Sequence, residues 1–171
     1  MDVNATAAAL LGLLRDGPAT GYALHTCAAA ELGDFWTVTR SQLYRELAAM
    51  ATAGLVAAGE AGARDARPYS LTEAGRTAFE RWLHSDPGAD VVRIPLLLRL
   101  AFADGLDPGR RDEMIAGQRA QHAAQLALYE SYEQAALQGG ARGVQLATLR
   151  FGLAYERAVL GWCDALAADL S

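Results

Sequence analysis

The sequence predicts a mainly helical protein whose N-terminal half also contains one small β-hairpin. Three observations predict this fold class. Alanine and leucine recur at spacings of three and four residues over most of the chain, which is typical of amphipathic helices. Residues suited to helix N-caps stand in front of most of these runs. One stretch departs from this helical pattern. A Gly-containing polar loop, residues 59–66, lies between two short apolar runs, and this pattern is typical of a hairpin.

The composition suits one domain or two small ones and excludes several classes of protein. The chain has 171 residues, of which 52% are hydrophobic and 20% are charged, so it can bury a core. No apolar run approaches the roughly 20 residues of a membrane span, and Asp2 stands where a signal peptide would carry cations. We therefore expect a cytoplasmic protein that is not bound to a membrane. Cys27 and Cys163 have no CxxC spacing, and both are expected to be buried free thiols.

Three helices with short connections are predicted at the N-terminus, over residues 5–15, 21–33 and 40–53. A glycine stands at or near the end of each run, and a side chain that can accept a backbone hydrogen bond stands just before each first turn. Two helices separated by a short break form a helix-turn-helix arrangement. The three predicted caps are Asn4, Thr20 and Thr39.

The hairpin and a fourth helix complete the predicted N-terminal domain. Residues 55–58 and 67–71 are expected to be its strands, and Pro68 suits an edge strand because proline has no N–H to donate. Thr72 can cap the fourth helix, in which apolar residues again recur at spacings of three and four. Three helices followed by a hairpin form a winged helix-turn-helix, and together with the fourth helix we assign this domain to residues 1–84.

The C-terminal half is predicted to be an antiparallel helical domain over residues 93–171, after a hinge at residues 85–92. A proline stands where the first helix should begin, and an Asp-Pro pair stands where the second should begin. Glycines stand where the two helices should end. We expect a short helix over residues 95–104 and two long helices over residues 108–137 and 142–169.

The last predicted helix carries apolar residues on two opposite sides. Such a helix must be covered on both sides, and a three-helix domain has too few other helices to cover both. A second copy of the chain is the simplest partner that could cover the remaining apolar side, so the sequence predicts a homodimer. The predicted interface residues are Leu146, Leu149, Leu153, Tyr155, Val159, Leu160, Trp162 and Leu166.

Polar side chains crowd the first turns of the third helix. Leu43, Leu47 and Met50 form its buried stripe, which leaves a face that is polar at its start and lined by small residues later. In helix-turn-helix docking, the N-terminal residues of the second helix face the bases, where Arg can bond to guanine and Gln to adenine. We therefore predict that this helix binds double-stranded DNA. The candidate contact residues are Thr39, Arg40, Ser41, Gln42, Tyr44 and Arg45.

The charge balance limits any DNA-binding surface to a local patch. The net charge is −5, residues 1–84 carry 7 arginines against 9 acidic residues, and residues 85–171 carry 8 arginines against 11. Arg64 and Arg67 flank the hairpin loop, where they could straddle the DNA backbone. The acidic balance mildly favours an alternative, in which the chain is a helical dimerisation module that binds protein partners on a winged-helix scaffold.

Four separated motifs resemble the PadR family of transcriptional regulators. They are LLGLLRDGPATGYAL, FWTVTRSQLYREL, GLV and YSLTEAGR, and they keep that family's order and spacing over about residues 8 to 83. LLLRLAFADGLDP and RFGLAYERAVLGWCDAL look like the helical C-terminal domain of the family's larger subgroup. The resemblance implies a dimeric winged-helix repressor, and a two-fold dimer predicts an inverted-repeat operator with half-sites a multiple of about 10 bp apart.

The resemblance also implies roles for single residues. By position, Thr20 and Tyr22 match the phosphate-facing start of the family's second helix. Ser41, Gln42, Tyr44 and Arg45 match its recognition helix, and Arg64 and Arg67 match its wing. The wing departs from the family pattern because it is shorter and contains Asp65, so we expect modest nonspecific affinity for DNA.

The remaining features favour neither an enzyme nor a metal or cofactor site. His25, His84 and His122 are scattered without metal-ligand spacing, and no catalytic or nucleotide-binding motif occurs. Aromatic residues at helical spacing are more often core, but such a group could also line a pocket for a small-molecule effector. The resemblance keeps this second interpretation open. The candidate pocket residues are Trp82, Tyr129, Tyr155 and Trp162.

Overall fold

In the computed structural model of the protein, the chain divides into two compact units. The units are Met1–Ala89 and Asp90–Ser171, and the division falls inside the segment 85–92. The structure describes residues 3–33, 35–60, 62, 67–89 and 92–169.

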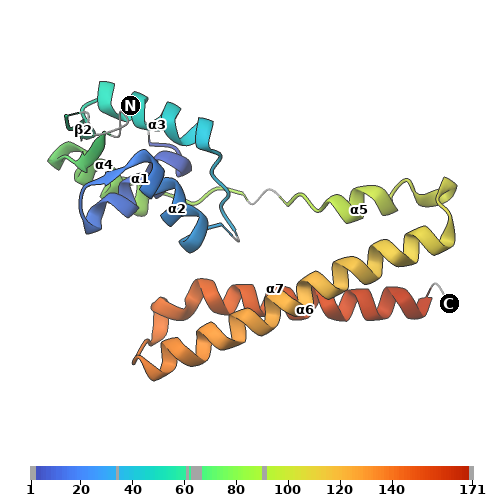
Figure 1. Ribbon diagram of the computed structural model, residues 1–171. Helices are drawn as coiled ribbons and strands as arrows, with labels where there is room; N and C mark the ends of the chain where they lie inside the picture. Colours follow the sequence, from blue (N-terminus) through green and yellow to red (C-terminus); the bar gives the residue numbers. More distant parts are fainter. Residues whose placement is uncertain (1–2, 34, 61, 63–66, 90–91, 170–171) are drawn as a thin grey trace. The chain divides into compact units, whose positions relative to one another are not determined.

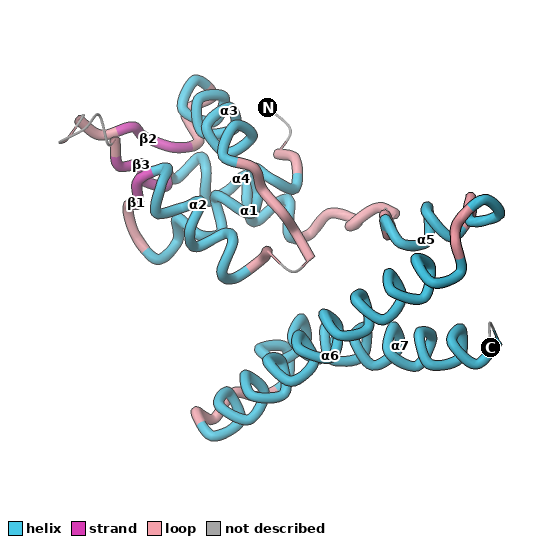
Figure 2. The backbone as a smooth tube through the Cα atoms, turned by 45° about the vertical axis from the view of Figure 1, so that its right-hand side comes forward, coloured by secondary structure: helices cyan, strands magenta, loops and turns pink. Residues whose placement is uncertain are grey.

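Four α-helices and a small antiparallel sheet make up the described part of the N-terminal unit (Figures 1 and 2). The helices lie where the sequence predicts them, although α2 ends at Glu31, two residues before Gly33. The predicted caps are also present: Asn4 accepts from the N–H of Ala7 at 2.9 Å, and Thr20 accepts from that of Ala23 at 3.2 Å. The elements are α1 Ala5–Leu13, β1 Ala19–Thr20, α2 Gly21–Glu31, α3 Arg40–Thr52, β2 Val56–Ala58, β3 Pro68–Leu71 and α4 Glu73–Leu83.

The sheet has the order β1-β3-β2, so β3 is its central strand. The prediction that Pro68 lies on an edge strand is therefore wrong. Pro68 is tolerated because it is the first residue of β3, and its carbonyl accepts a hydrogen bond of 2.8 Å from Gly59 N–H. The sequence did not predict β1, which has only two residues and pairs through Ala19 with Tyr69.

The core of the N-terminal unit lies where α1, α2 and α3 meet, and the predicted stripe of α3 is confirmed. Leu43, Leu47 and Met50 are fully buried, together with Leu10 and Leu11 of α1. Burying a leucine side chain stabilises a fold by about 1.5–3 kcal/mol relative to exposing it. This packing fixes one face of α3 toward the interior and leaves its opposite face toward solvent.

The base of the wing is held by a close approach of α4. Thr72 donates its hydroxyl to the carbonyl oxygens of Gly54 and Leu55, at 2.8 and 2.9 Å, and also caps α4 by accepting from the N–H of Gly75. A Cβ at Gly75 would lie 2.0 Å from the Leu55 carbonyl oxygen, so only glycine permits this contact. The start of β2 is thereby anchored to α4.

The described C-terminal unit contains α5 Pro95–Leu100, α6 Pro108–Gln138 and α7 Ala147–Asp169. The two long helices form the predicted antiparallel hairpin. Single 3-10 turns at Ala103–Gly105 and Gly143–Leu146 replace the predicted end of the short helix and the predicted start of the last one. No helix among the described residues is long and apolar enough to cross a membrane.

Charged side chains pair between α6 and α7. Arg119 bonds to Asp164 at 2.6 Å and Arg157 to Glu130 at 2.8 Å. The hydrogen bond from Arg119 holds the pKa of Asp164 below its usual value. Glu133 also pairs, with Arg150 at 3.0 Å, so Glu130 and Glu133 both join α6 to α7.

The two apolar sides of α7 have different surroundings within one chain. Leu146, in the turn before α7, and Leu153 are only 1% and 2% exposed, so the chain itself already covers them and leaves little of their surface for the predicted dimer contact. Leu149 and Leu160 share that side of the last helix and are half-buried. On the opposite side, Tyr155 is 38% exposed, and Val159, Trp162 and Leu166 are half-buried.

The two cysteines also differ in their surroundings. Cys163 is buried, as predicted, but Cys27 of α2 is exposed, so its predicted burial is wrong. The buried stripe of α2 contains Leu24 and Ala28, and Cys27 is the residue just before Ala28. At about 100° per residue, Cys27 lies at the edge of this stripe, where its side chain reaches solvent.

Candidate nucleic-acid interface

The start of α3 presents the predicted polar side chains to solvent. Arg40, Ser41 and Arg45 are exposed, and Tyr44 is 45% exposed. Ala48 continues this face one turn later and is also exposed, so no bulky side chain obstructs it. A face with long donors at its N-terminal end and small residues after them fits a major groove.

Thr39 and Gln42 form a capping box at the N-terminus of α3. Thr39 accepts a hydrogen bond from the backbone N–H of Gln42 at 3.3 Å, and the Gln42 side-chain oxygen accepts one from the Thr39 N–H at 3.0 Å. The hydroxyls of Thr39 and Ser41 lie 3.3 Å apart. The T-x-x-Q spacing in the sequence could have identified this box, because a glutamine three residues after a threonine cap is its signature.

Arginines of this surface lack acidic partners within the described part of the chain. Arg40, Arg45 and Arg67 are exposed, and none of them forms an ion pair with a described carboxylate. The neighbouring carboxylate of Glu46 instead accepts a hydrogen bond from the Asn4 side chain at 3.2 Å. Several arginines of the C-terminal unit, in contrast, form ion pairs. The guanidinium groups of Arg40, Arg45 and Arg67, which pair with no described carboxylate, therefore give this surface local positive charge although the protein as a whole is acidic.

Tyrosines join the start of α2 to the start of α3. Tyr22 is 65% exposed, and its ring centroid lies 5.9 Å from the guanidinium carbon of Arg40. The Tyr44 ring packs so closely on Gly21 that a Cβ there would lie 2.5 Å from the ring. The start of α2, which is predicted to face phosphate, therefore adjoins the start of the predicted recognition helix.

The wing carries the remaining predicted cations. Arg67 is exposed immediately before β3, whereas Arg64 lies outside the residues that the structure describes. Ala58 pairs with Tyr69, and Gly59 bonds to Pro68, so Arg67 stands at the end of a regular hairpin ladder.

The four predicted pocket residues do not come together in one described unit. Trp82 belongs to the N-terminal unit, where it stacks on Phe79 with ring centroids 6.3 Å apart. In the C-terminal unit, Tyr129 is buried against Gly152, and Tyr155 stands edge-on to His122 at 6.0 Å. Trp162 is half-buried on α7.

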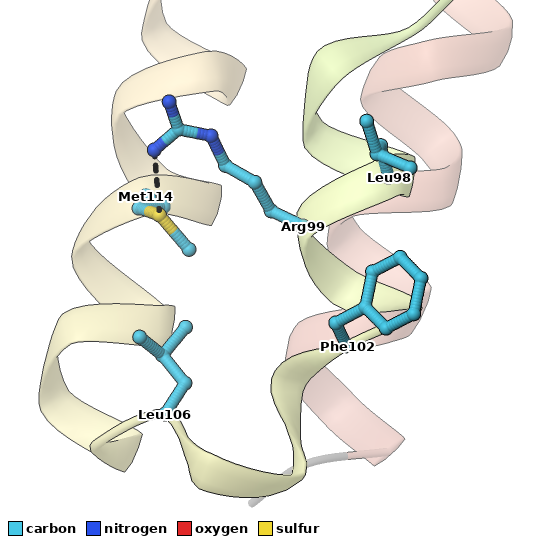
Figure 3. Close-up of a pocket in the computed structure, with 5 residues that line it drawn as sticks. All are labelled: Leu98, Arg99, Phe102, Leu106 and Met114. Atoms are coloured by element: carbon cyan, nitrogen blue, oxygen red, sulfur yellow. Dashed lines mark hydrogen bonds between the residues drawn. The ribbon is translucent and has the colours of Figure 1, made fainter.

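An open depression between α5 and α6 is lined by none of these four residues. Figure 3 shows Arg99 extending from α5 toward Met114 on α6, with its guanidinium 4.0 Å from the Met114 sulfur. From the sequence alone this apolar segment could be assigned only to a helix, because the depression depends on how α5 packs against α6. The lining residues are Leu98, Arg99, Phe102, Leu106 and Met114.

Comparison with known proteins assigns both halves of the chain. Residues 10–81 match the model of the transcriptional regulator PadR-like family, and residues 92–171 match a model described as virulence activator alpha C-term. The negative transcriptional regulator PadR of Bacillus subtilis (strain 168) is 27% identical over 173 residues, which cover 94% of each chain. Residues 10–81 therefore form a domain of the PadR-like family of transcriptional regulators. PadR-like proteins are regulators rather than enzymes, which agrees with the sequence-based prediction of no enzymatic activity.

Solved structures of PadR proteins share the fold of this PadR-like chain. A crystal structure of Bacillus subtilis PadR in complex with operator DNA has a TM-score of 0.79 at 23% identity, covering 98% of this chain and 100% of that one. A crystal structure of Bacillus subtilis PadR in complex with p-coumaric acid has a TM-score of 0.69 at 24% identity, covering 98% and 97%. The likeness confirms the predicted fold class of a winged helix-turn-helix followed by a helical region.

Proposed function

We propose that this PadR-like regulator is a sequence-specific DNA-binding repressor that binds an inverted-repeat operator as a homodimer. The observation that carries the proposal is the cluster of exposed donors at the start of α3, where Arg40 and Arg45 have no described carboxylate partner. The operator complex of Bacillus subtilis PadR and the negative regulation in the name of its relative support the same conclusion.

The exposed residues divide by the part of DNA that each would contact. Ser41 and Arg45 would face base edges, because they lie on the exposed face opposite Leu43 and Leu47. Gln42 would contribute only its amide N–H groups while its oxygen caps α3. The remaining candidates would hold the DNA backbone. They are Thr20, Thr39, Arg40, Tyr44, Arg64 and Arg67, and Tyr22 stands beside Arg40.

A homodimer is supported by the apolar side of α7 that its own chain leaves uncovered. Phe151 is 68% exposed and Tyr155 is 38% exposed, with Val159, Trp162 and Leu166 half-buried beyond them. A second copy would cover this side and relate two recognition helices by a two-fold axis. Major grooves on one face of a duplex recur about every 10 bp, which sets the spacing of the half-sites.

DNA footprinting on selected sites tests the proposal directly. We expect a protected inverted repeat of roughly 15 to 30 bp, and operator binding that survives a salt concentration that abolishes binding to random DNA. Binding to random DNA should be lost at a lower salt concentration because only a few arginines are available to neutralise phosphates. An asymmetric site, or equal retention on both DNAs at high salt, would contradict the two-fold regulator and favour the protein-interaction module.

The direction of regulation has two candidates. Repression is supported by the Bacillus subtilis relative, whereas activation is supported by the description of the model that matches residues 92–171. Transcription from the bound promoter in a purified system separates them: a repressor lowers the transcript level and an activator raises it.

Release of DNA by a small aromatic effector is part of the proposal. It is supported by the p-coumaric acid complex of Bacillus subtilis PadR. Titration of p-coumaric acid and of related phenolic acids into the preformed DNA complex should dissociate it if such a ligand is the effector. Unchanged DNA binding across the series would remove this part of the proposal and leave the regulator without an aromatic acid effector.

A further inference from the structure

Tyr22 is a large aromatic side chain on the outer face of the N-terminal unit. It is 65% exposed at the second residue of α2, so it adds little to the core. Its ring centroid is 5.9 Å from the guanidinium carbon of Arg40, the first residue of α3. This distance is within the range at which the negative face of an aromatic ring attracts a cation.

The backbones that carry these two side chains are each fixed by a cap. Thr20 accepts a hydrogen bond from Ala23 N–H, which holds the first turn of α2 around Tyr22. The capping box of Thr39 and Gln42 does the same for the first turn of α3. Arg40 and Tyr22 therefore stand on two ordered helix starts.

The two helix starts are also held against each other. Tyr44 of α3 packs on Gly21, next to Tyr22, and a Cβ at Gly21 would lie only 2.5 Å from the Tyr44 ring. The absence of a side chain at Gly21 lets the second turn of α3 approach the start of α2. The contact between Tyr22 and Arg40 is thus set by the packing of the helices as well as by the attraction of the two side chains.

We propose that Tyr22 is a positioning residue for Arg40 and that it acts on DNA through Arg40. The ring restricts the arginine before DNA binds, so less side-chain entropy is lost on binding. A guanidinium that lies over an aromatic face keeps its N–H edge free, and a backbone phosphate is the acceptor that matches this edge at a helix N-terminus. This inference rests on the proposed DNA binding, and it replaces a direct phosphate contact by the Tyr22 hydroxyl.

A double-mutant cycle on DNA affinity tests the inference, with the operator and random DNA as ligands. Tyr22→Leu should weaken binding about two- to fivefold, as expected for a cation and an aromatic ring at an exposed site. In the Arg40→Ala background, Tyr22→Leu should cause no further loss. Tyr22→Phe is the matched control, because it keeps the ring, and it should bind like the unaltered protein.

The salt dependence distinguishes positioning from direct contact. Arg40→Ala should lower the slope of log affinity against log salt by about one unit, because one phosphate is no longer neutralised. Tyr22→Leu should leave the slope unchanged, since Arg40 still reaches the phosphate. Additive losses in the cycle, or a loss in Tyr22→Phe, would overturn the inference and assign Tyr22 a contact of its own.

A measurement on the protein without DNA separates this inference from the proposed function. The Tyr22 ring current should displace the NMR signals of the Arg40 side chain, and Tyr22→Leu should remove that displacement while thermal unfolding stays unchanged. Absence of the displacement overturns the positioning role even if the protein binds DNA. A displacement in a protein that binds no DNA would instead refute the proposed function and the DNA role of this pair.

Discussion

The side-chain oxygen of Gln42 accepts hydrogen bonds from both the backbone N–H and the hydroxyl of Thr39, at 3.0 and 2.8 Å. A glutamine that reads adenine needs its oxygen and its amide nitrogen together. Gln42 could form that bidentate contact only by releasing the cap of α3. Helix capping therefore competes with base reading at this position.

Substitution of Gln42 tests this assignment. Gln42→Ala should lower the free energy of unfolding by up to about 1 kcal/mol, because one half of the capping box is lost. Gln42→Glu should preserve stability, since a carboxylate also accepts from Thr39 and suits the positive end of a helix. Urea unfolding measures both variants. Equal stability of all three proteins would show that the cap contributes nothing, and full DNA affinity of Gln42→Glu would exclude a bidentate adenine contact.

Arg45 and Arg67 should differ in how they affect DNA binding. Arg45→Ala is expected to lose about 1–3 kcal/mol on the operator and less on random DNA, as a base contact would. Arg67→Ala should weaken both DNAs alike and reduce the salt slope by about one unit, as a phosphate contact would. Fluorescence anisotropy at several salt concentrations measures both effects. If Arg45→Ala lost equal affinity for the two DNAs, Arg45 would contact the DNA backbone and not the bases.

The half-buried His122 and the buried Glu156 are expected to stabilise the C-terminal unit as a pair. Glu156 is 5% exposed, and its carboxylate lies 2.5 Å from His122 Nδ1. His122→Leu should cost about 3–5 kcal/mol at neutral pH, because it leaves a buried carboxylate without this partner. The double variant His122→Leu/Glu156→Leu should recover most of that loss, since two apolar side chains replace the pair. Thermal unfolding measures both, and a stable single variant would contradict the pairing.

Neighbouring positions on α7 separate folding from dimerisation. Phe151→Asp places a charge on a side chain that is 68% exposed in one chain, so the subunit should fold but sediment as a monomer at micromolar concentration. Leu153→Asp is the matched variant on the opposite side, where the side chain is 2% exposed, and it should lower the melting temperature. A dimeric Phe151→Asp protein would place the dimer contact elsewhere.

The two thiols should react with an alkylating reagent at very different rates. Cys27 is exposed, whereas Cys163 is buried, and desolvation raises the pKa of the Cys163 thiol. Less thiolate at neutral pH and less access both slow the reaction of Cys163. Mass spectrometry after brief treatment with iodoacetamide should find one label in the native protein, on Cys27, and two in urea. Rapid labelling of native Cys163 would show that the interface of α6 and α7 opens readily.

Local patterns were sufficient to predict most helices and the buried face of α3. Asn4, Thr20 and Thr39 cap the helices they precede, and Leu43, Leu47 and Met50 are buried, because capping and helical periodicity act over a few residues. The exposed polar residues of α3 followed from the same geometry, since burying one stripe leaves the other face to solvent. The sequence by itself thus determined the winged-helix class and the face of the candidate interface.

Only the tertiary structure decided features that depend on which residues meet across the chain. Strand β1 exists because Ala19 reaches Tyr69, which makes β3 central and Pro68 a strand start rather than an edge residue. The chain itself covers Leu153 and leaves Phe151 exposed, although both lie on apolar stripes of one helix. Helical periodicity shows that a face is apolar, but the burial of each side chain depends on what packs against it, and this is set by contacts between residues distant in sequence.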